Sequence, residues 1–343
     1  MKKNSRLSFF TILTTGRTGS DYLQSCLDSV PGVLTLPGKT YFKNFFESLE
    51  FKFEKYSNKQ LIVFFIKKYK NLFVEDIIEN KKANIDTKKF IKTFLNISKN
   101  VKLSKRKFIE LIFLSYEKIT RDKVKSIKVI INHSHSKIET EYFLKLFPES
   151  NLLVTIRNPL NNLRSGIENW RKYEKFFYGE RNYFYIKRIL YDLLFAKRVN
   201  RKKFFVKLES SFKKKEKLKL VKFLNIKYSK KINIATYNGK VWIGDKLSQN
   251  RTKDGSFNFS ILKKKDNNFY SNRDLYTLSY FYRDYKKFGY LKSSKNSFLQ
   301  KIKFLILSIF PLEFEKKTFL ENPFKIDSYM FYFKRILLFL KNI

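Results

Sequence analysis

The chain contains little of three residue types that characterise whole classes of protein. It has one cysteine, Cys26, ten glycines and six prolines in 343 residues. A single cysteine cannot form an internal disulfide, and with only two histidines the chain lacks the Cys/His set of a structural zinc site. So few glycines and prolines exclude collagen-like, proline-rich and flexible-linker sequences. A globular chain remains, with 43% apolar residues for a core and a length that suits about two domains.

Long apolar runs are also missing. No stretch of 18 apolar residues occurs, and the longest uncharged stretch near the C-terminus, residues 304–312, is too short to span a bilayer. Lys2, Lys3 and Arg6 precede the apolar run Leu7 to Leu13, as in a secretory signal, but no Ala-x-Ala-like cleavage site follows. The sequence therefore predicts a cytoplasmic location and leaves peripheral membrane contact open.

Acidic residues are scarce, with 30 against 73 basic residues, and the formal net charge is +43. Such a charge suggests a nucleic-acid or anionic-membrane partner. Every consecutive block of 50 residues is basic, however, and lysines outnumber arginines 58 to 15, whereas phosphate and base recognition favours arginine. The charge therefore indicates a composition bias over the whole surface. A non-enzymatic basic protein that binds nucleic acid or membrane stays an open alternative.

Short apolar segments alternate with helical patterns along much of the chain. Leu7 to Leu13 is typical of a buried parallel strand, and the helix that follows its glycine turn is stopped by Pro31-Gly32. Further strands are predicted at 127–132 (ending at His133), 151–156 and 204–208, and further helices at 137–146, 159–172 and 214–224. This alternation predicts an α/β fold with a mostly parallel central sheet flanked by helices.

Two regions are predicted to be helical throughout. Residues 41–122 contain no glycine or proline and repeat Phe, Ile and Leu at helical spacing, which predicts a helical insertion between strands. Segments at 275–290, 298–312 and 329–340 predict a C-terminal helical extension, residues 261–343, packed on the α/β domain of residues 1–260. The extension either caps the domain by burying its aromatic stripes or forms a basic amphipathic surface on anionic lipid.

The turn after the first predicted strand is a candidate anion site. Residues 14–20 read Thr-Thr-Gly-Arg-Thr-Gly-Ser. Backbone N–H groups in such a turn lie at the positive end of the helix dipole, which favours a bound anion. The Gly-Lys-Ser/Thr ending of the ATP-binding Walker motif is missing, which argues against a nucleotide-dependent kinase.

A second candidate anion site follows the strand at 151–156. Arg157 leaves this strand at its carboxyl end, where ligands of open α/β sheets bind. Pro159 suits the first turn of the next helix, and Ser165 lies two turns further along.

The only two histidines, His133 and His135, lie at the end of a predicted strand between these two motifs. Histidine is the side chain best suited to accept a proton near neutral pH. We therefore expect one of them to be a catalytic base, and the sequence does not choose between them.

The three motifs together resemble the sulfotransferases that use 3′-phosphoadenosine 5′-phosphosulfate (PAPS). The 5′-phosphosulfate loop of that family, approximately Pro-Lys/Arg-Ser/Thr-Gly-Thr/Ser-Thr, is similar to Gly16-Arg17-Thr18-Gly19-Ser20-Asp21. Its 3′-phosphate motif, an arginine followed by Asn/Asp-Pro and a later serine, is similar to Arg157-Asn158-Pro159 with Ser165. In many members the base is a histidine upstream of that arginine, and His133 and His135 lie 24 and 22 residues upstream.

Weaker similarities extend the resemblance to about residues 7–38 and 127–250. Segments similar to family segments are Lys207–Phe212, Phe223–Asn225 and Tyr237–Asp245. Arg251, Lys253 and Gly255 match loosely the Arg-Lys-Gly of the family, which binds the 3′-phosphate.

Two residues of the first motif depart from the family pattern. Asp21 stands where a hydroxyl residue is usual, and a carboxylate beside a phosphate repels it. Arg17 replaces the commoner lysine, which keeps the charge but changes the hydrogen-bond geometry.

The resemblance implies a P-loop-like fold and an enzyme that transfers a sulfuryl group from PAPS to an acceptor hydroxyl, with no metal. Residues 16–21 with Arg157, Ser165, Arg251 and Lys253 would bind PAPS. Arg17 would neutralise the leaving phosphate, and His133 or His135 would take the proton of the acceptor. The position closer to the strand end favours His133, whereas the spacing to Arg157 fits His135 slightly better. Leu34 to Gly38 resembles a stretch leading to the acceptor site of carbohydrate-type members, so we expect a sugar or glycolipid hydroxyl.

Overall fold

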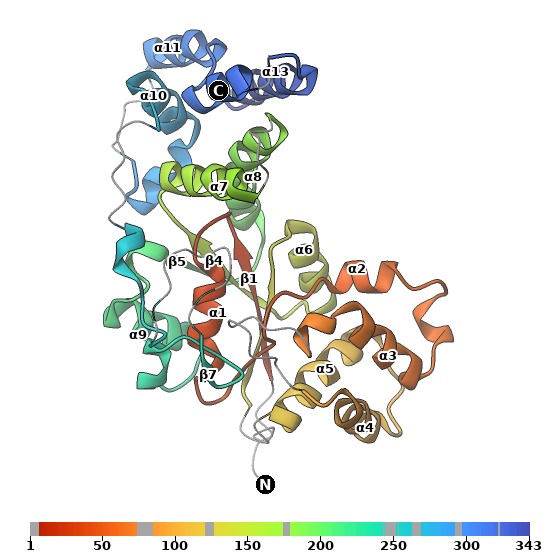
Figure 1. Ribbon diagram of the computed structural model, residues 1–343. Helices are drawn as coiled ribbons and strands as arrows, with labels where there is room; N and C mark the ends of the chain where they lie inside the picture. Colours follow the sequence, from red (N-terminus) through yellow and green to blue (C-terminus); the bar gives the residue numbers. More distant parts are fainter. Residues whose placement is uncertain are drawn as a thin grey trace. The chain divides into compact units, whose positions relative to one another are not determined.

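The computed structural model describes residues 7–73, 85–120, 127–173, 179–242, 244, 252, 254–262, 269–291, 297–321 and 323–343 (Figure 1). The chain divides into two compact units. The sheet unit comprises Met1–Thr14, Gly19–Thr155 and Val199–Leu262, and the helical unit comprises Thr15–Thr18, Ile156–Arg198 and Lys263–Ile343. One division, after Leu262, lies near the boundary predicted at residue 260. Residues 156–198, however, group with the C-terminal helices.

Five strands form the central sheet, in the order β2-β3-β1-β4-β5. The middle strand β1 (Ser8–Thr14) is parallel to β3 (Val129–Ser134) and to β4 (Asn151–Ile156). At one edge β2 (Val33–Thr35) is parallel to β3, and at the other β5 (Lys203–Lys207) lies beside β4. The predicted α/β fold with a mostly parallel sheet is confirmed.

The register brings the carboxyl ends of β1, β3 and β4 to the same edge of the sheet. Leu13 pairs with Ser134, and Thr14 pairs with Thr155. The segments that follow these three strands carry the glycine turn, His135 and Arg157, so all three predicted motifs begin at this edge.

Alternate side chains of the strands belong to two separate cores. Phe9 and Ile130 pack with residues of the inserted helices, whereas Phe10 and Ile131 pack with residues of the other face of the sheet. That other face is covered by α1 (Ser20–Asp28) and α9 (Lys214–Phe223), which lie on the opposite side of the sheet from the insertion in Figure 1.

The insertion is helical in its described parts, as predicted. It is built around buried phenylalanines: Phe45 and Phe108 stack at a ring-centroid distance of 5.5 Å, and Phe65 meets Phe108 edge-on at 6.0 Å. The helices of the insertion are α2 (Phe42–Glu47), α3 (Asn58–Lys68), α4 (Thr87–Ser98) and α5 (Lys105–Thr120). One further helix, α6 (Lys137–Leu146), follows β3 and packs into the same core.

The helical unit contains α7 and α8, after β4, and the C-terminal helices. Gly166 allows close packing of α7 on α8, because a Cβ there would lie 2.5 Å from the ring of Tyr185. In the part of the chain described, no helix is long and apolar enough to cross a membrane. The helices are α7 (Pro159–Tyr173), α8 (Gly179–Arg198), α10 (Asn272–Phe281), α11 (Phe298–Ile309), α12 (Glu313–Glu321) and α13 (Ile326–Leu340).

Candidate active site

A buried side chain from α7 holds the glycine turn that links β1 to α1. The Oδ1 atom of Asn162 accepts a hydrogen bond from the N–H of Arg17 (2.7 Å), and its Nδ2 donates to the carbonyl of Thr15 (2.7 Å). Gly16 has a φ of +114°, and a Cβ there would lie 2.7 Å from Asn162 Oδ1. Contacts with Asn162 therefore define the backbone of the turn.

Arg157 lies beside the same turn. Its Nη1 donates to the carbonyl of Arg17 at 3.4 Å, although the two residues are 140 positions apart in the sequence. Ser165 is half-buried on α7, three residues after Asn162 and therefore on the same side of the helix. The structure thus brings together the two motifs that the sequence analysis singled out as anion sites.

The turn ends where α1 begins. Gly19 precedes the helix in the left-handed conformation (φ +75°), and a Cβ there would lie 2.5 Å from Leu208 Cδ1. The first N–H groups of a helix have no acceptor within it and lie at the positive end of its dipole. The N–H of Thr18, which precedes the helix, donates to the carbonyl of Gly16 (3.0 Å).

His133 lies within β3 and not at its predicted end, because the strand continues for one more residue, to Ser134. Its side chain is completely buried, and its Nδ1 is 2.7 Å from Gln24 Oε1. The amide nitrogen of Gln24 donates to the carbonyls of Leu36 and Gly38, so its oxygen is an acceptor. His133 must therefore carry its hydrogen on Nδ1.

Burial makes His133 a very weak base. Burial, reinforced by the neighbouring His135, lowers its pKa to about 3, although Asp21 acts in the opposite direction. With Nδ1 protonated, Nε2 has no hydrogen-bond partner among the residues that the structure describes. His133 is a neutral imidazole at physiological pH.

His135 has different surroundings, because it follows the strand. Its side chain is 24% exposed, and its Nε2 lies 3.2 Å from Ser20 Oγ and 3.5 Å from Asp21 Oδ2. Burial raises the pKa of the Asp21 carboxyl, but His135, Lys39 and His133 together lower it well below its ordinary value. His135 therefore faces an ionised carboxylate and is accessible to solvent.

Asp21 lies close to three basic side chains. Besides His135, it lies 3.6 Å from Lys39 Nζ and 4.0 Å from His133 Nδ1. The carboxylate that departs from the family pattern therefore belongs to the histidine cluster. Its expected place among the PAPS-binding residues stays a prediction.

Three residues of the site were not found from the sequence: Gln24, Lys39 and Asn162. Gln24 lies on the buried face of α1, and Asn162 lies on the buried face of α7. A polar residue on the apolar face of an amphipathic helix is a usable signal, since buried polar groups need partners. Lys39 offers no such signal in a chain with 58 lysines.

Asp21, His133 and His135 form the one group of three potential metal ligands in the described parts of the chain, with ligand atoms within 4.8 Å of one another. Lys39 pairs with Asp21, and Gln24 accepts the Nδ1 hydrogen of His133. The expected absence of a metal stays a prediction.

Arg251 and Lys253 lie outside the described residues. Gly255 is described, and its carbonyl accepts a hydrogen bond from the N–H of Ala235 (2.9 Å). A role of this segment at the 3′-phosphate therefore stays a prediction.

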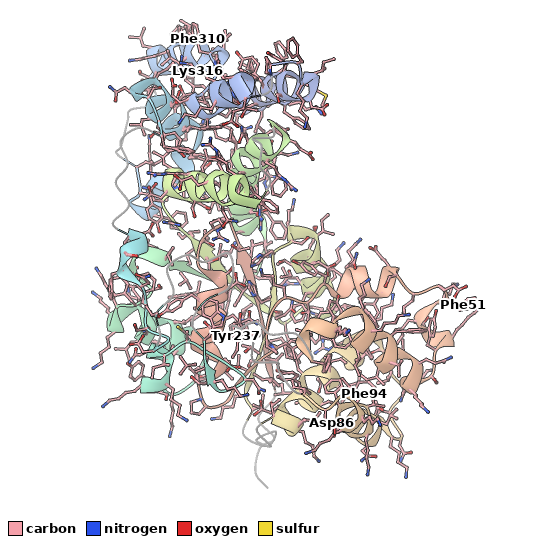
Figure 2. The ribbon with its side chains drawn as sticks, in the orientation of Figure 1. Phe51, Asp86, Phe94, Tyr237, Phe310 and Lys316 are labelled. Atoms are coloured by element: carbon pink, nitrogen blue, oxygen red, sulfur yellow. The ribbon has the colours of Figure 1, made fainter. Side chains whose placement is uncertain are left out.

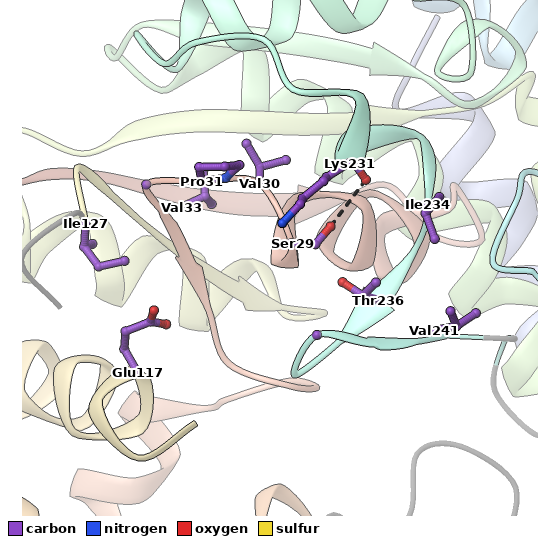
Figure 3. A pocket seen from close by; sticks show the side chains of 12 residues that line it. Ser29, Val30, Pro31, Val33, Glu117, Ile127, Lys231, Ile234, Thr236 and Val241 are labelled. Carbon is purple, nitrogen blue, oxygen red and sulfur yellow. Dashed lines mark hydrogen bonds between the residues drawn. The ribbon is translucent and has the colours of Figure 1, made fainter. Parts of the chain in front are cut away.

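A separate cavity of about 370 Å³ lies in the sheet unit (Figure 3). Its walls include Val30, Val33 and Ile127, near the amino ends of β2 and β3, together with Glu117 of α5. No predicted site residue lines it. The parallel strands place this cavity at the edge of the sheet opposite to the one where the motifs begin.

No protein-family model and no curated protein matches the chain. Among solved structures, it is similar to the sulfotransferase domain from the curacin biosynthetic pathway, with a TM-score of 0.39 and 15% identity over 67% of this chain and 78% of that one. The match to sulfotransferase STF9 from Mycobacterium avium has a TM-score of 0.37 and 12% identity and covers 66% of each chain. The match to the sulfotransferase domain from the Synechococcus PCC 7002 olefin synthase has a TM-score of 0.37 and 13% identity. It covers 90% of this chain and 98% of that one. All three are named as sulfotransferases.

Proposed function

We propose that this protein is a sulfotransferase that moves a sulfuryl group from PAPS to a hydroxyl of an acceptor. The observation that carries the proposal is the contact between Arg157 and the glycine turn. A nucleotide with groups at both its 3′ and 5′ positions needs two anion sites at a fixed separation, and this contact joins two candidate anion sites. The buried Asn162 holds the turn in place between them.

Each anion site has donors of the right kind. The N–H groups of Gly19 and Ser20 and the hydroxyl of Thr18 would hold the 5′ end, where the helix dipole favours negative charge. Arg17 is partly exposed and would neutralise the charge that develops on the departing phosphate. Arg157 and Ser165 would hold the 3′-phosphate, the group that distinguishes PAPS from ATP.

We propose His135 as the base, since it is accessible and His133 is not. The acceptor oxygen attacks sulfur, and the bond from sulfur to the 5′-phosphate oxygen breaks, leaving its electron pair on that phosphate. The acceptor proton passes to His135. The ionised Asp21, 3.5 Å away, stabilises the imidazolium that forms. His133, hydrogen-bonded to Gln24, would act as a positioning residue.

For the acceptor we propose a sugar or glycolipid hydroxyl. The support is the resemblance of Leu34 to Gly38 to a stretch near the acceptor site of carbohydrate-type members. Gln24 binds the carbonyls of Leu36 and Gly38 with its amide nitrogen and faces His133 with its oxygen. This segment is therefore tied directly to the histidine cluster.

The test is thermal unfolding with nucleotides. Adenosine 3′,5′-bisphosphate, the spent donor, should raise the melting temperature more than adenosine 5′-monophosphate, because only the former reaches Arg157. Arg157→Ala should remove the difference. Arg171→Ala, an exposed arginine further along α7, is the matched control and should keep it. Two results would contradict the proposal. One is a larger rise in melting temperature with ATP and Mg²⁺ than with adenosine 3′,5′-bisphosphate. The other is a rise with adenosine 3′,5′-bisphosphate that is as large in Arg157→Ala as in the parent chain.

A further inference from the structure

Exposed apolar side chains gather in one part of the chain. Of the 24 large hydrophobic residues that are exposed in the described segments, 14 lie between residues 298 and 340. Soluble surfaces normally scatter such residues singly, and a large contiguous group marks an interaction surface.

Helix α13 carries a regular stripe. Apart from Tyr329, its exposed large hydrophobic residues follow one another at intervals of four, three, four and three, which places them on one side of the helix. Phe333 is 60% exposed and Leu337 is 56% exposed, whereas Leu338 and Phe339 on the other side are buried. The stripe consists of Ile326, Met330, Phe333, Leu337 and Leu340.

Helix α11 also has one buried side and one exposed apolar side. Phe304 and Ser308 are fully buried, one turn apart, while Ile306 is 54% and Ile309 is 56% exposed. The exposed side consists of Phe298, Leu299, Ile302, Ile306 and Ile309. We call the exposed residues of these two stripes the apolar face.

Internal contacts join α11 and α13 into one pair. The buried guanidinium of Arg335 on α13 donates to the carbonyls of Ser308 and Phe310 (3.0 Å for Phe310) and pairs with Glu315 of α12 (2.8 Å). The rings of Phe304 and Phe339 pack at 5.7 Å. Arg335, Phe304 and Phe339 thus hold the pair together on its inner side, and the apolar face lies on the exposed side.

The charges around the apolar face favour an anionic partner. Lys301 and Lys303 of α11 and Lys334 of α13 are exposed. Helix α11 contains no acidic residue, and α13 contains one, Asp327. Figure 2 shows Phe310 and Lys316 in this C-terminal part of the chain. A second copy of the chain, also at +43, would be repelled, whereas a surface of anionic lipids would be attracted.

We propose that the apolar face of α11 and α13 binds the surface of an anionic membrane. The two helices lie in the interface, with Phe333, Leu337 and Ile306 among the upper acyl chains and the flanking lysines at the headgroup level. No described helix could instead span the bilayer. The proposal does not depend on the sulfotransferase function.

The test is co-sedimentation of the full chain with vesicles. Vesicles of phosphatidylcholine and phosphatidylglycerol should bind it, vesicles of phosphatidylcholine alone should bind it much less, and added salt should weaken binding. The double variant Ile306→Glu/Phe333→Glu should reduce partitioning by about tenfold or more, because it places carboxylates in the apolar layer. The matched control is Phe51→Glu, a comparably exposed residue (54%) of the sheet unit, labelled in Figure 2, and it should bind like the parent.

A second measurement does not depend on loss of binding. Cys26 is buried, so Leu337→Cys offers one accessible thiol for an environment-sensitive dye, and mixed vesicles should shift its emission to the blue. The same dye on Phe51→Cys should not respond. The proposal is overturned if the mixed vesicles do not bind the chain or if Phe51→Glu loses binding as much as the double variant. It is also overturned if the double variant instead abolishes a dimer seen by sedimentation.

Discussion

His133 and His135 are two residues apart in sequence, yet they have opposite chemical properties. His133 is inside β3, completely buried and bonded to Gln24, while His135 follows the strand and reaches solvent beside Asp21. The family resemblance fits both histidines. The difference between them arises from where β3 ends and from which helix covers its face.

His135→Asn should lower kcat by about 10² to 10⁴ with little change in the melting temperature, because it removes the group that accepts the proton. His133→Asn should mainly lower stability and retain more activity. Rates of sulfuryl transfer and melting temperatures of both variants check this assignment. If the two variants exchanged these effects, His133 would be the base.

His133 should also make stability depend on pH. Its pKa is about 3 in the folded chain and near 6.5 when unfolded, so only the unfolded state gains a proton between these values. Stability is therefore retained above pH 6.5 and falls as the pH drops toward 3, with a loss of about 2 kcal/mol between about pH 7.5 and about pH 5. Denaturant unfolding at both pH values measures this loss. The loss should be absent from His133→Asn, and an equal pH dependence in that variant would contradict the burial argument.

At the scale of elements, α7 organises the turn. The helix begins at Pro159, shortly after the end of β4. One turn later, Asn162 hydrogen-bonds to the backbone of Thr15 and Arg17, the two neighbours of Gly16. Gly166 then permits the close approach of α8. One helix therefore links the glycine turn, Arg157 at its start and the packing of the helical unit.

Asn162→Ala should weaken binding of adenosine 3′,5′-bisphosphate about tenfold and destabilise the chain by about 1–3 kcal/mol, because it removes two hydrogen bonds that hold the backbone of the turn. Calorimetric titration and denaturant unfolding measure the two effects. Asn161→Ala changes the same residue type at an exposed neighbouring position and should leave both values unchanged. Equal effects of the two substitutions would show that the turn does not depend on Asn162.

At the scale of the whole molecule, the charge and the site should be separable. A surface of +43 binds any polyanion through released counterions, without needing particular residues. Recognition of a small nucleotide needs the specific placement of Arg157. The two hypotheses therefore differ in what Arg157→Ala changes. Binding of a polyanion should persist in this variant, whereas binding of the nucleotide should be lost.

Binding of polyuridylate RNA should fall steeply with salt and should be the same for Arg157→Ala as for the parent chain. Binding of adenosine 3′,5′-bisphosphate should depend on Arg157 and vary less with salt. Fluorescence anisotropy with both ligands over a salt series makes the comparison. Salt-resistant RNA binding that is lost in Arg157→Ala would instead favour a nucleic-acid-binding protein.

The spacing of apolar residues and the turn residues between them predicted the bounds of most helices and strands closely. The strand at 151–156 and the helix at 137–146 have the predicted bounds, since an apolar run between polar turns and a 3.6-residue repeat are local signals. Helix α8 and the short edge strand β2 were not predicted. The three residues of β2 are too few to show a repeat, and their pairing with β3 is a long-range contact.

The sequence by itself determined the α/β alternation, the positive charge and the three motifs, because each depends on residue types and spacings along the chain. Only the tertiary structure decided which histidine is accessible, that Asp21 faces the histidines, that Asn162 holds the turn, and that α11 and α13 leave an apolar face exposed. Burial and hydrogen-bond partners are set by residues distant in sequence. A pattern along the chain cannot specify them until the sheet and its helices bring those residues together.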